Sequence, residues 1–90
     1  MIVEEQFVVE SELGLHARPA GEFASAASKF AAEISVSRVG IEEWVSGRSV
    51  LSLLSLAASR GTALRVRAEG EDAEAAVATL GGLLRRPHAG

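Results

Sequence analysis

The 90-residue chain contains no cysteine, which excludes disulfide bonds, thiolate catalysis and zinc bound through thiolates. Its two histidines, His16 and His88, are far apart in the sequence and give little support to a metal site. We therefore expect no metal ion and no cofactor, and we expect packing alone to hold the fold together.

Long apolar runs are also absent. A helix that spans a bilayer needs roughly 20 consecutive apolar residues, and no run in this sequence approaches that length. Residues 1–5 lack the basic start of a secretory signal. These absences predict a cytoplasmic protein with no direct insertion into a membrane.

Basic and aromatic side chains are scarce. The formal net charge is −3 and aromatic residues make up 4% of the chain, whereas nucleic-acid binding usually needs a basic surface. The sequence has no Gly-x-x-x-x-Gly-Lys-Ser/Thr loop, no dinucleotide fingerprint and no paired acidic cluster beside His16 to hold magnesium. We therefore expect no nucleic-acid partner and no nucleotide-dependent kinase activity.

The apolar content of 48% in 90 residues predicts one domain with a modest core. We place this domain at residues 1–86. Because Pro87 ends the last helical pattern, residues 87–90 are expected to form a frayed tail.

Two periodicities alternate along the chain. Alternating apolar residues predict strands at 3–10, 33–39, 44–46 and 63–69. Apolar residues at helical spacing predict helices at 17–31, at 50–58 and from 73 to the residues before Pro87. The order βαββαβα predicts an α+β fold in which three helices cover one face of a four-stranded antiparallel sheet.

Three local expectations accompany this arrangement. Asp72 should cap the last helix, and Gly81 and Gly82 should make its final turns the weakest. The sheet face opposite the helices should be exposed to water. The residues expected on that face are Ser35, Ser37, Arg65 and Arg67.

The most informative segment places His16 directly before a predicted helix. The first N–H groups of a helix have no intrahelical acceptor and carry partial positive charge, so a helix start can bind an anion. Arg18 adds a permanent cation, and Pro19 suits the first turn, where a missing N–H matters little. Imidazole titrates near neutrality and can attack phosphorus without strong activation. His16 is therefore a candidate phosphoryl carrier, stabilised by Arg18 and by the N–H of Ala17.

Such a phosphate would arrive from another phosphoprotein and leave to one, so the carrier also needs a docking surface. The predicted helix at 50–58 holds more apolar residues than one narrow stripe requires, and some of them should face a partner. Leu53 and Leu56 should reach the core. The candidates for contact with partner proteins are Val50, Leu51 and Leu54.

Three segments, Gly14–Ala20, Gly47–Leu56 and Ala68–Ala73, carry a resemblance to a known family. In this order they are similar to the active-site motif, the serine-phosphorylation and docking segment, and the segment before the last helix of HPr, the histidine-containing phosphocarrier of the bacterial sugar phosphotransferase system. The resemblance covers essentially the whole chain. It implies an open-faced β-sandwich of four antiparallel strands and three helices.

The resemblance implies that His16 accepts a phosphoryl group on Nδ1 from phosphorylated enzyme I, itself charged by phosphoenolpyruvate, and passes it to a sugar-specific enzyme IIA. Arg18 would position the phosphate in a stoichiometric carrier that is not an enzyme. Ser49, the predicted N-cap of the second helix, aligns with a serine modified by an ATP-dependent kinase in some bacteria. A serine kinase or phosphorylase is thus a further candidate partner, and we expect a monomer.

Two features depart from the family pattern. The turn at 41–44 is longer than in the commonest relatives, and serines replace the lysines that many relatives carry around the docking face, which weakens electrostatic steering. These serines are Ser25, Ser28 and Ser52. Two other functions stay open at this point. One is a regulatory binding module controlled at Ser49 or serving a nitrogen-related branch, and the other is an interaction domain in which His16 has no chemical role.

Overall fold

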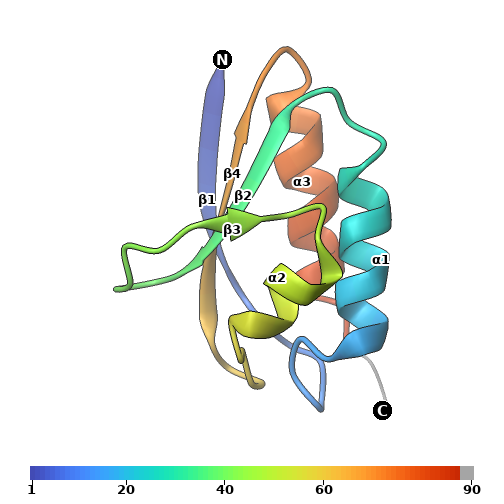
Figure 1. Ribbon diagram of the computed structural model, residues 1–90, viewed down its shortest axis with the longest axis vertical. Coiled ribbons are helices and arrows are strands. Elements are labelled where there is room, and N and C mark those ends of the chain that lie inside the picture. The colour runs from blue at the N-terminus through green and yellow to red at the C-terminus, as the bar shows by residue number, and fades with distance from the viewer. Residues whose placement is uncertain (88–90) are drawn as a thin grey trace.

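The computed structural model describes residues 1–87, which form four strands and three helices in the predicted order. All strand pairings are antiparallel within this part of the chain, the sheet order is β1-β4-β2-β3, and the helices lie on one side of the sheet (Figure 1). The elements are β1 (Ile2–Val8), α1 (Ala17–Ala27), β2 (Glu33–Arg38), β3 (Val45–Ser46), α2 (Val50–Ser55), β4 (Ala63–Glu69) and α3 (Ala73–Leu84). The predicted α+β fold is confirmed, while residues 88–90 of the predicted tail at 87–90 lie outside the described residues.

The core lies between the sheet and the helices. Alternate residues of β1, β2 and β4 point into it, as the period-2 pattern predicts, and each helix contributes its apolar stripe. The largest fully buried apolar side chains are those of Val9, Phe23, Val36, Leu53, Leu64, Val66, Val77 and Leu80. Phe30 and Leu83, which belong to the predicted stripes, are only partly buried.

The first helix is shorter than its sequence pattern predicts. It ends at Ala27 rather than near residue 31, and the Ser28 hydroxyl donates to the Ala24 carbonyl at 2.9 Å. Beyond that point, the carboxylate of Asp72 accepts hydrogen bonds from the N–H groups of Ala31 and Ala32 at 2.8 and 2.9 Å. The chain therefore leaves the helix axis to reach a partner 40 residues away in the sequence.

This arrangement also corrects the prediction that Asp72 caps α3 with its side chain. Asp72 is the N-cap residue, but its carboxylate makes no capping hydrogen bond because both oxygens are used by Ala31 and Ala32. The side chain therefore ties the start of α3 to the turn before β2.

Replacing Asp72 by alanine is expected to lower the free energy of unfolding by about 2 kcal/mol, because two backbone donors lose a charged acceptor. Urea denaturation of Asp72→Ala against Glu71→Ala measures the difference. Glu71 is exposed and adjacent, so its variant controls for the loss of a carboxylate at this turn. Equal stability of the two variants would contradict the role given to Asp72.

The open face of the sheet is not uniformly exposed to water. Ser37 is fully buried, contrary to prediction, because the loop between β2 and β3 folds over it. The Ser37 hydroxyl donates to the Ile41 carbonyl at 2.7 Å and accepts from Arg65 Nη2 at 3.0 Å. The Trp44 ring covers the Arg65 guanidinium at 4.5 Å. Ser35 and Arg67 remain partly exposed on this face.

Candidate functional site

The loop before α1 is held in one conformation by the segment that follows α2. Gly14 has φ +76°, a region that suits glycine, and a Cβ at this position would collide with the Ala58 carbonyl. The N–H of the buried Leu15 donates to the same carbonyl at 2.8 Å. The predicted second helix reaches only Ser55, and Ala57 adopts a left-handed φ of 52°. That early end frees the Ala58 carbonyl to fix the backbone next to His16.

His16 is the N-cap residue of α1. Its backbone is extended, its carbonyl accepts from the Ala20 N–H at 2.9 Å, and its side chain makes no capping hydrogen bond. The ring is partly buried, and Nε2 is enclosed without a hydrogen-bond partner in the described structure. The ring is therefore oriented by packing and not by a polar contact.

The first turn of α1 offers unpaired donors beside this ring. The N–H groups of Ala17 and Arg18 find no backbone acceptor among residues 1–87, and Pro19 has no N–H to offer. The Arg18 guanidinium is exposed and makes neither an ion pair nor a hydrogen bond within that range. The arrangement can hold an anion next to an imidazole at a helix start.

The α2 helix lies beside α1 and contacts it. Leu53 and Leu56 are buried as predicted, whereas Leu51 is 80% exposed and both Val50 and Leu54 are 36% exposed. An exposed apolar surface of this kind, on the same side of the sheet as His16, suits contact with a protein.

The predicted N-cap role of Ser49 is observed, since its hydroxyl accepts from the Ser52 N–H at 3.1 Å. The neighbouring Arg48 holds this end of α2 to the turn after α1. Its Nη2 donates to the carbonyls of Phe30 and Ala32, both at 2.8 Å. The start of α2 is therefore fixed from both sides.

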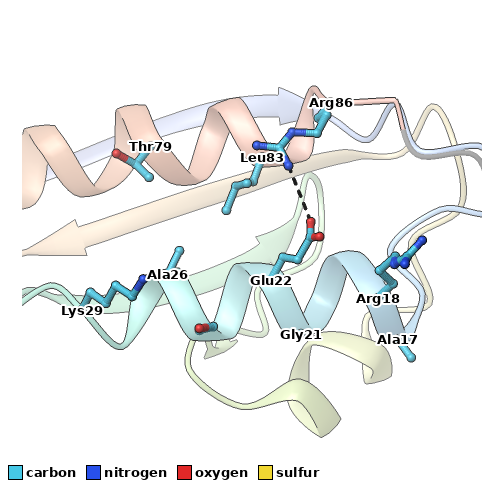
Figure 2. Close-up of a pocket in the computed structure, with 10 residues that line it drawn as sticks. Ala17, Arg18, Gly21, Glu22, Ala26, Lys29, Thr79, Leu83 and Arg86 are labelled. Atoms are coloured by element: carbon cyan, nitrogen blue, oxygen red, sulfur yellow. Dashed lines mark ion pairs between the residues drawn. The ribbon is translucent and has the colours of Figure 1, made fainter.

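Two features escaped the sequence analysis. Leu13 is 65% exposed in the loop that carries His16, and it adds to the apolar surface of this end of the molecule. In the sequence, the only indication of this role is that Leu13 is a lone apolar side chain among the polar residues of 10–14. The second feature is a groove of about 630 Å³ between α1 and α3, which begins at Ala17 and Arg18 (Figure 2). The sequence could not predict this groove, because its two walls come from helices whose packing against each other is not visible in the sequence.

The described residues also bear on metal binding and on membrane insertion. No group of three or more potential ligands is placed to hold a metal ion in residues 1–87. Over the same range, none of the helices is both long enough and apolar enough to cross a bilayer.

Comparisons with known proteins agree with this geometry. The family model for the PTS HPr component phosphorylation site matches residues 3–86. The phosphocarrier protein HPr of Haloferax volcanii is 38% identical, with 97% of this chain and 98% of the relative covered. The multiphosphoryl transfer protein of Salmonella typhimurium is 37% identical over 89% of this chain, which corresponds to 22% of that larger protein.

Solved structures lead to the same family. The crystal structure of a phosphocarrier protein HPr from Bacillus anthracis superimposes with a TM-score of 0.85 at 32% identity, covering 92% of this chain and 96% of that one. The HPr of Thermoanaerobacter tengcongensis gives 0.84 at 35% identity, with 91% and 90% covered. Because the family model, full-length relatives and the fold agree, the chain belongs to the HPr family of the phosphotransferase system.

Proposed function

We propose that the protein is a cytoplasmic phosphocarrier of the sugar phosphotransferase system, which takes a phosphoryl group from phosphorylated enzyme I onto His16 and passes it to an enzyme IIA. Membership of the HPr family supports the carrier role. The observation that carries the choice of atom is the enclosure of Nε2, which leaves Nδ1 as the ring nitrogen for phosphorus.

The transfer needs only the residues at the start of α1. The lone pair of Nδ1 forms the new nitrogen–phosphorus bond while the bond from phosphorus to the donor breaks, and the electron pair of the broken bond stays with the donor. The N–H groups of Ala17 and Arg18 and the Arg18 guanidinium stabilise the phosphoryl oxygens. The reverse sequence of bond changes delivers the group to the acceptor.

A mild hold on the phosphate suits a relay. The helix-dipole contribution at an exposed site is typically about 1 kcal/mol or less, so the phosphohistidine stays reactive. Arg18 is exposed and does not enclose the ring. The protein therefore acts as a stoichiometric carrier, which presents its imidazole and holds the phosphoryl group only mildly.

The test is incubation of the protein with enzyme I and phosphoenolpyruvate labelled in the phosphate. We expect one label per chain that is acid-labile and base-stable, that maps to His16 by mass spectrometry and that is discharged when enzyme IIA is added. Failure to label the protein, or label on a serine only, would overturn the proposal.

For docking, we propose that Val50, Leu51 and Leu54 of α2, together with Ala17 of α1, contact enzyme I and enzyme IIA. Their support is the exposure of these apolar side chains on α2 and at the start of α1, two helices that contact each other, with His16 as the N-cap residue of α1. Leu51→Ser is expected to raise the KM for enzyme I about fivefold, the loss expected when one exposed leucine is no longer buried by a partner. The maximal rate and the folding stability should stay unchanged.

The matched control for Leu51 is Ile41→Ser. Ile41 is also an exposed aliphatic residue, but it lies in the β2–β3 loop. Its carbonyl accepts a hydrogen bond from Arg65 on the open face of the sheet. Steady-state kinetics of phosphate uptake compares the two variants. An equal change in KM for both would remove α2 from the proposed docking surface.

We further propose that Ser49 is a regulatory position, modified by a serine kinase and restored by a phosphorylase. Its support is partial exposure at the start of α2, immediately before Val50 and Leu51. A phosphate there adds close to two negative charges beside an apolar docking surface, which would weaken partner binding.

A further inference from the structure

A side chain on the sheet reaches the segment that fixes the backbone next to His16. Arg38 is the last residue of β2, and its Nη1 donates to the Leu56 carbonyl at 3.3 Å. Leu56 is the C-cap residue of α2. From this contact we propose that Arg38 is a positioning residue for phosphoryl transfer, which acts on His16 through the end of α2. The inference rests on the proposed carrier function.

The place of Arg38 in its strand explains why the guanidinium meets α2. Ile34 and Val36 of β2 are buried in the core, and Arg38 continues their alternation, so its side chain leaves the sheet on the side that the helices cover. This side chain is partly buried and makes no ion pair within residues 1–87. The last carbonyls of a helix have no intrahelical donor, and a hydrogen bond from a cation satisfies them well. Arg38 therefore supplies the donor that the end of α2 lacks.

The residue after Leu56 adopts a backbone conformation that needs such support. Ala57 has a φ of 52°, in the left-handed region that is unfavourable for a residue with a Cβ. A strained residue keeps its conformation only when the groups around it hold it there. The Arg38 contact holds the residue before Ala57, and the hydrogen bond from the Leu15 N–H holds Ala58, the residue after it.

The left-handed turn at Ala57 sets the direction of the next carbonyl, and this carbonyl fixes the loop before α1. The buried Ala58 presents its oxygen to the Leu15 N–H at 2.8 Å. Gly14 packs against the same oxygen, and its own carbonyl accepts from the His16 N–H at 2.9 Å. A shift of the Ala58 carbonyl therefore moves the backbone that carries the imidazole. The ring follows that backbone, because its Nε2 has no hydrogen-bond partner in the described part of the chain.

A misplaced imidazole affects the reaction differently from a damaged docking surface. Displacement of a reacting group by about 1 Å can reduce a rate roughly 100-fold. The exposed Val50 and Leu51 lie at the other end of α2, where the Ser49 hydroxyl caps the helix, so they stay in place when Arg38 is removed. Loss of Arg38 should therefore lower the maximal rate of transfer, whereas loss of a docking contact raises KM.

The experiment compares Arg38→Met with Arg60→Met in phosphoryl transfer from phosphorylated enzyme I. Methionine keeps an unbranched apolar side chain but none of the donors of arginine. Arg60 is exposed in the turn after Ala58 and makes no ion pair within the described residues, so its variant controls for the same change in charge. We expect Arg38→Met to lower the maximal rate about fivefold at unchanged KM, and Arg60→Met to match the wild type. Both should still reach one phosphate per chain, because a slow carrier fills completely and a partly unfolded one does not.

Hydrogen exchange of the Leu15 amide gives a second measurement, which needs no partner protein. In Arg38→Met this amide should exchange about tenfold faster than in the wild type, because its acceptor is no longer held. The Leu53 amide, which donates to the Ser49 carbonyl at 3.0 Å near the start of α2, should keep its wild-type rate. Adding Ala57→Gly to Arg38→Met should restore both the protection and the transfer rate, since glycine adopts the left-handed conformation without strain.

Equal maximal rates for Arg38→Met and Arg60→Met would overturn the inference, as would unchanged exchange at Leu15. A slow Arg38→Met that Ala57→Gly does not restore would rule out the route through α2. If circular dichroism shows that Arg38→Met does not fold, Arg38→Gln and Arg60→Gln replace the pair with the same expectations. A wild-type protein that accepts no phosphate would instead contradict the carrier function, and the exchange measurement would still test the coupling of Arg38 to Leu15.

Discussion

His16→Ala is expected to reduce phosphate uptake from enzyme I and phosphoenolpyruvate to the background of an unphosphorylated protein. The chain has no cysteine to act as a substitute nucleophile, and its other histidine, His88, lies 72 positions later in the sequence. The folded state should persist, since the His16 side chain makes no capping hydrogen bond and Nε2 has no partner within the described residues. Scintillation counting of the labelled protein after gel filtration gives the result.

Two controls define this experiment. His88→Ala removes the other imidazole and should take up phosphate like the wild type. The free energy of unfolding of His16→Ala, measured by thermal denaturation, should lie within about 0.5 kcal/mol of the wild-type value. This is the usual range for a substitution of a side chain without a specific partner. Acid-labile label retained by His16→Ala would show that another residue carries the phosphate.

The second large effect concerns two neighbouring glycines with opposite expected results. A Cβ on Gly81 would overlap the ring of Phe7, which is buried, so Gly81→Ala should destabilise the protein by about 2 kcal/mol, the typical result of overpacking. A Cβ on Gly82 meets nothing within 4 Å, so Gly82→Ala should stabilise it by about 0.5–1 kcal/mol through helix propensity. Urea denaturation of both variants measures the two signs.

The surroundings of Gly81 add a packing role to the expectation that both glycines weaken the end of α3. Gly81 is buried where the helix crosses Phe7, and one turn later the Leu84 carbonyl accepts from the Glu10 N–H at 3.1 Å. A residue without a side chain therefore lets α3 approach the end of β1 closely. Stabilisation by both substitutions would mean that Phe7 can move aside.

The parts of the fold that were predictable depend on local patterns. The strict alternation of Leu64, Val66 and Ala68 gave β4 its observed bounds, because one buried face fixes the period of a strand. The ends of α1 and α2 were not predictable from such patterns. Both are set by partners distant in sequence, namely Asp72 for the turn after α1 and Leu15 for the segment after α2.

The candidate site divides in the same way. His16, Arg18 and Ser49 follow from their positions at helix starts, which sequence motifs reveal directly. The groove joins Lys29 to Arg86, and Ser37 is buried through the fold of the β2–β3 loop. Neither could be predicted, because helix pairing and loop folding depend on tertiary packing and not on periodicity.

The contact between Trp44 and Arg65 has a practical consequence for all these measurements. The chain has one tryptophan and no tyrosine, and the indole lies against Arg65 and Arg67 on the open face of the sheet. The helices α1 and α2 lie on the other side of the sheet (Figure 1). Its emission is therefore expected to report loss of the native sheet, because the ring lies away from the docking surface proposed on α2. Tryptophan fluorescence of the isolated protein can therefore follow the unfolding of the sheet in each variant.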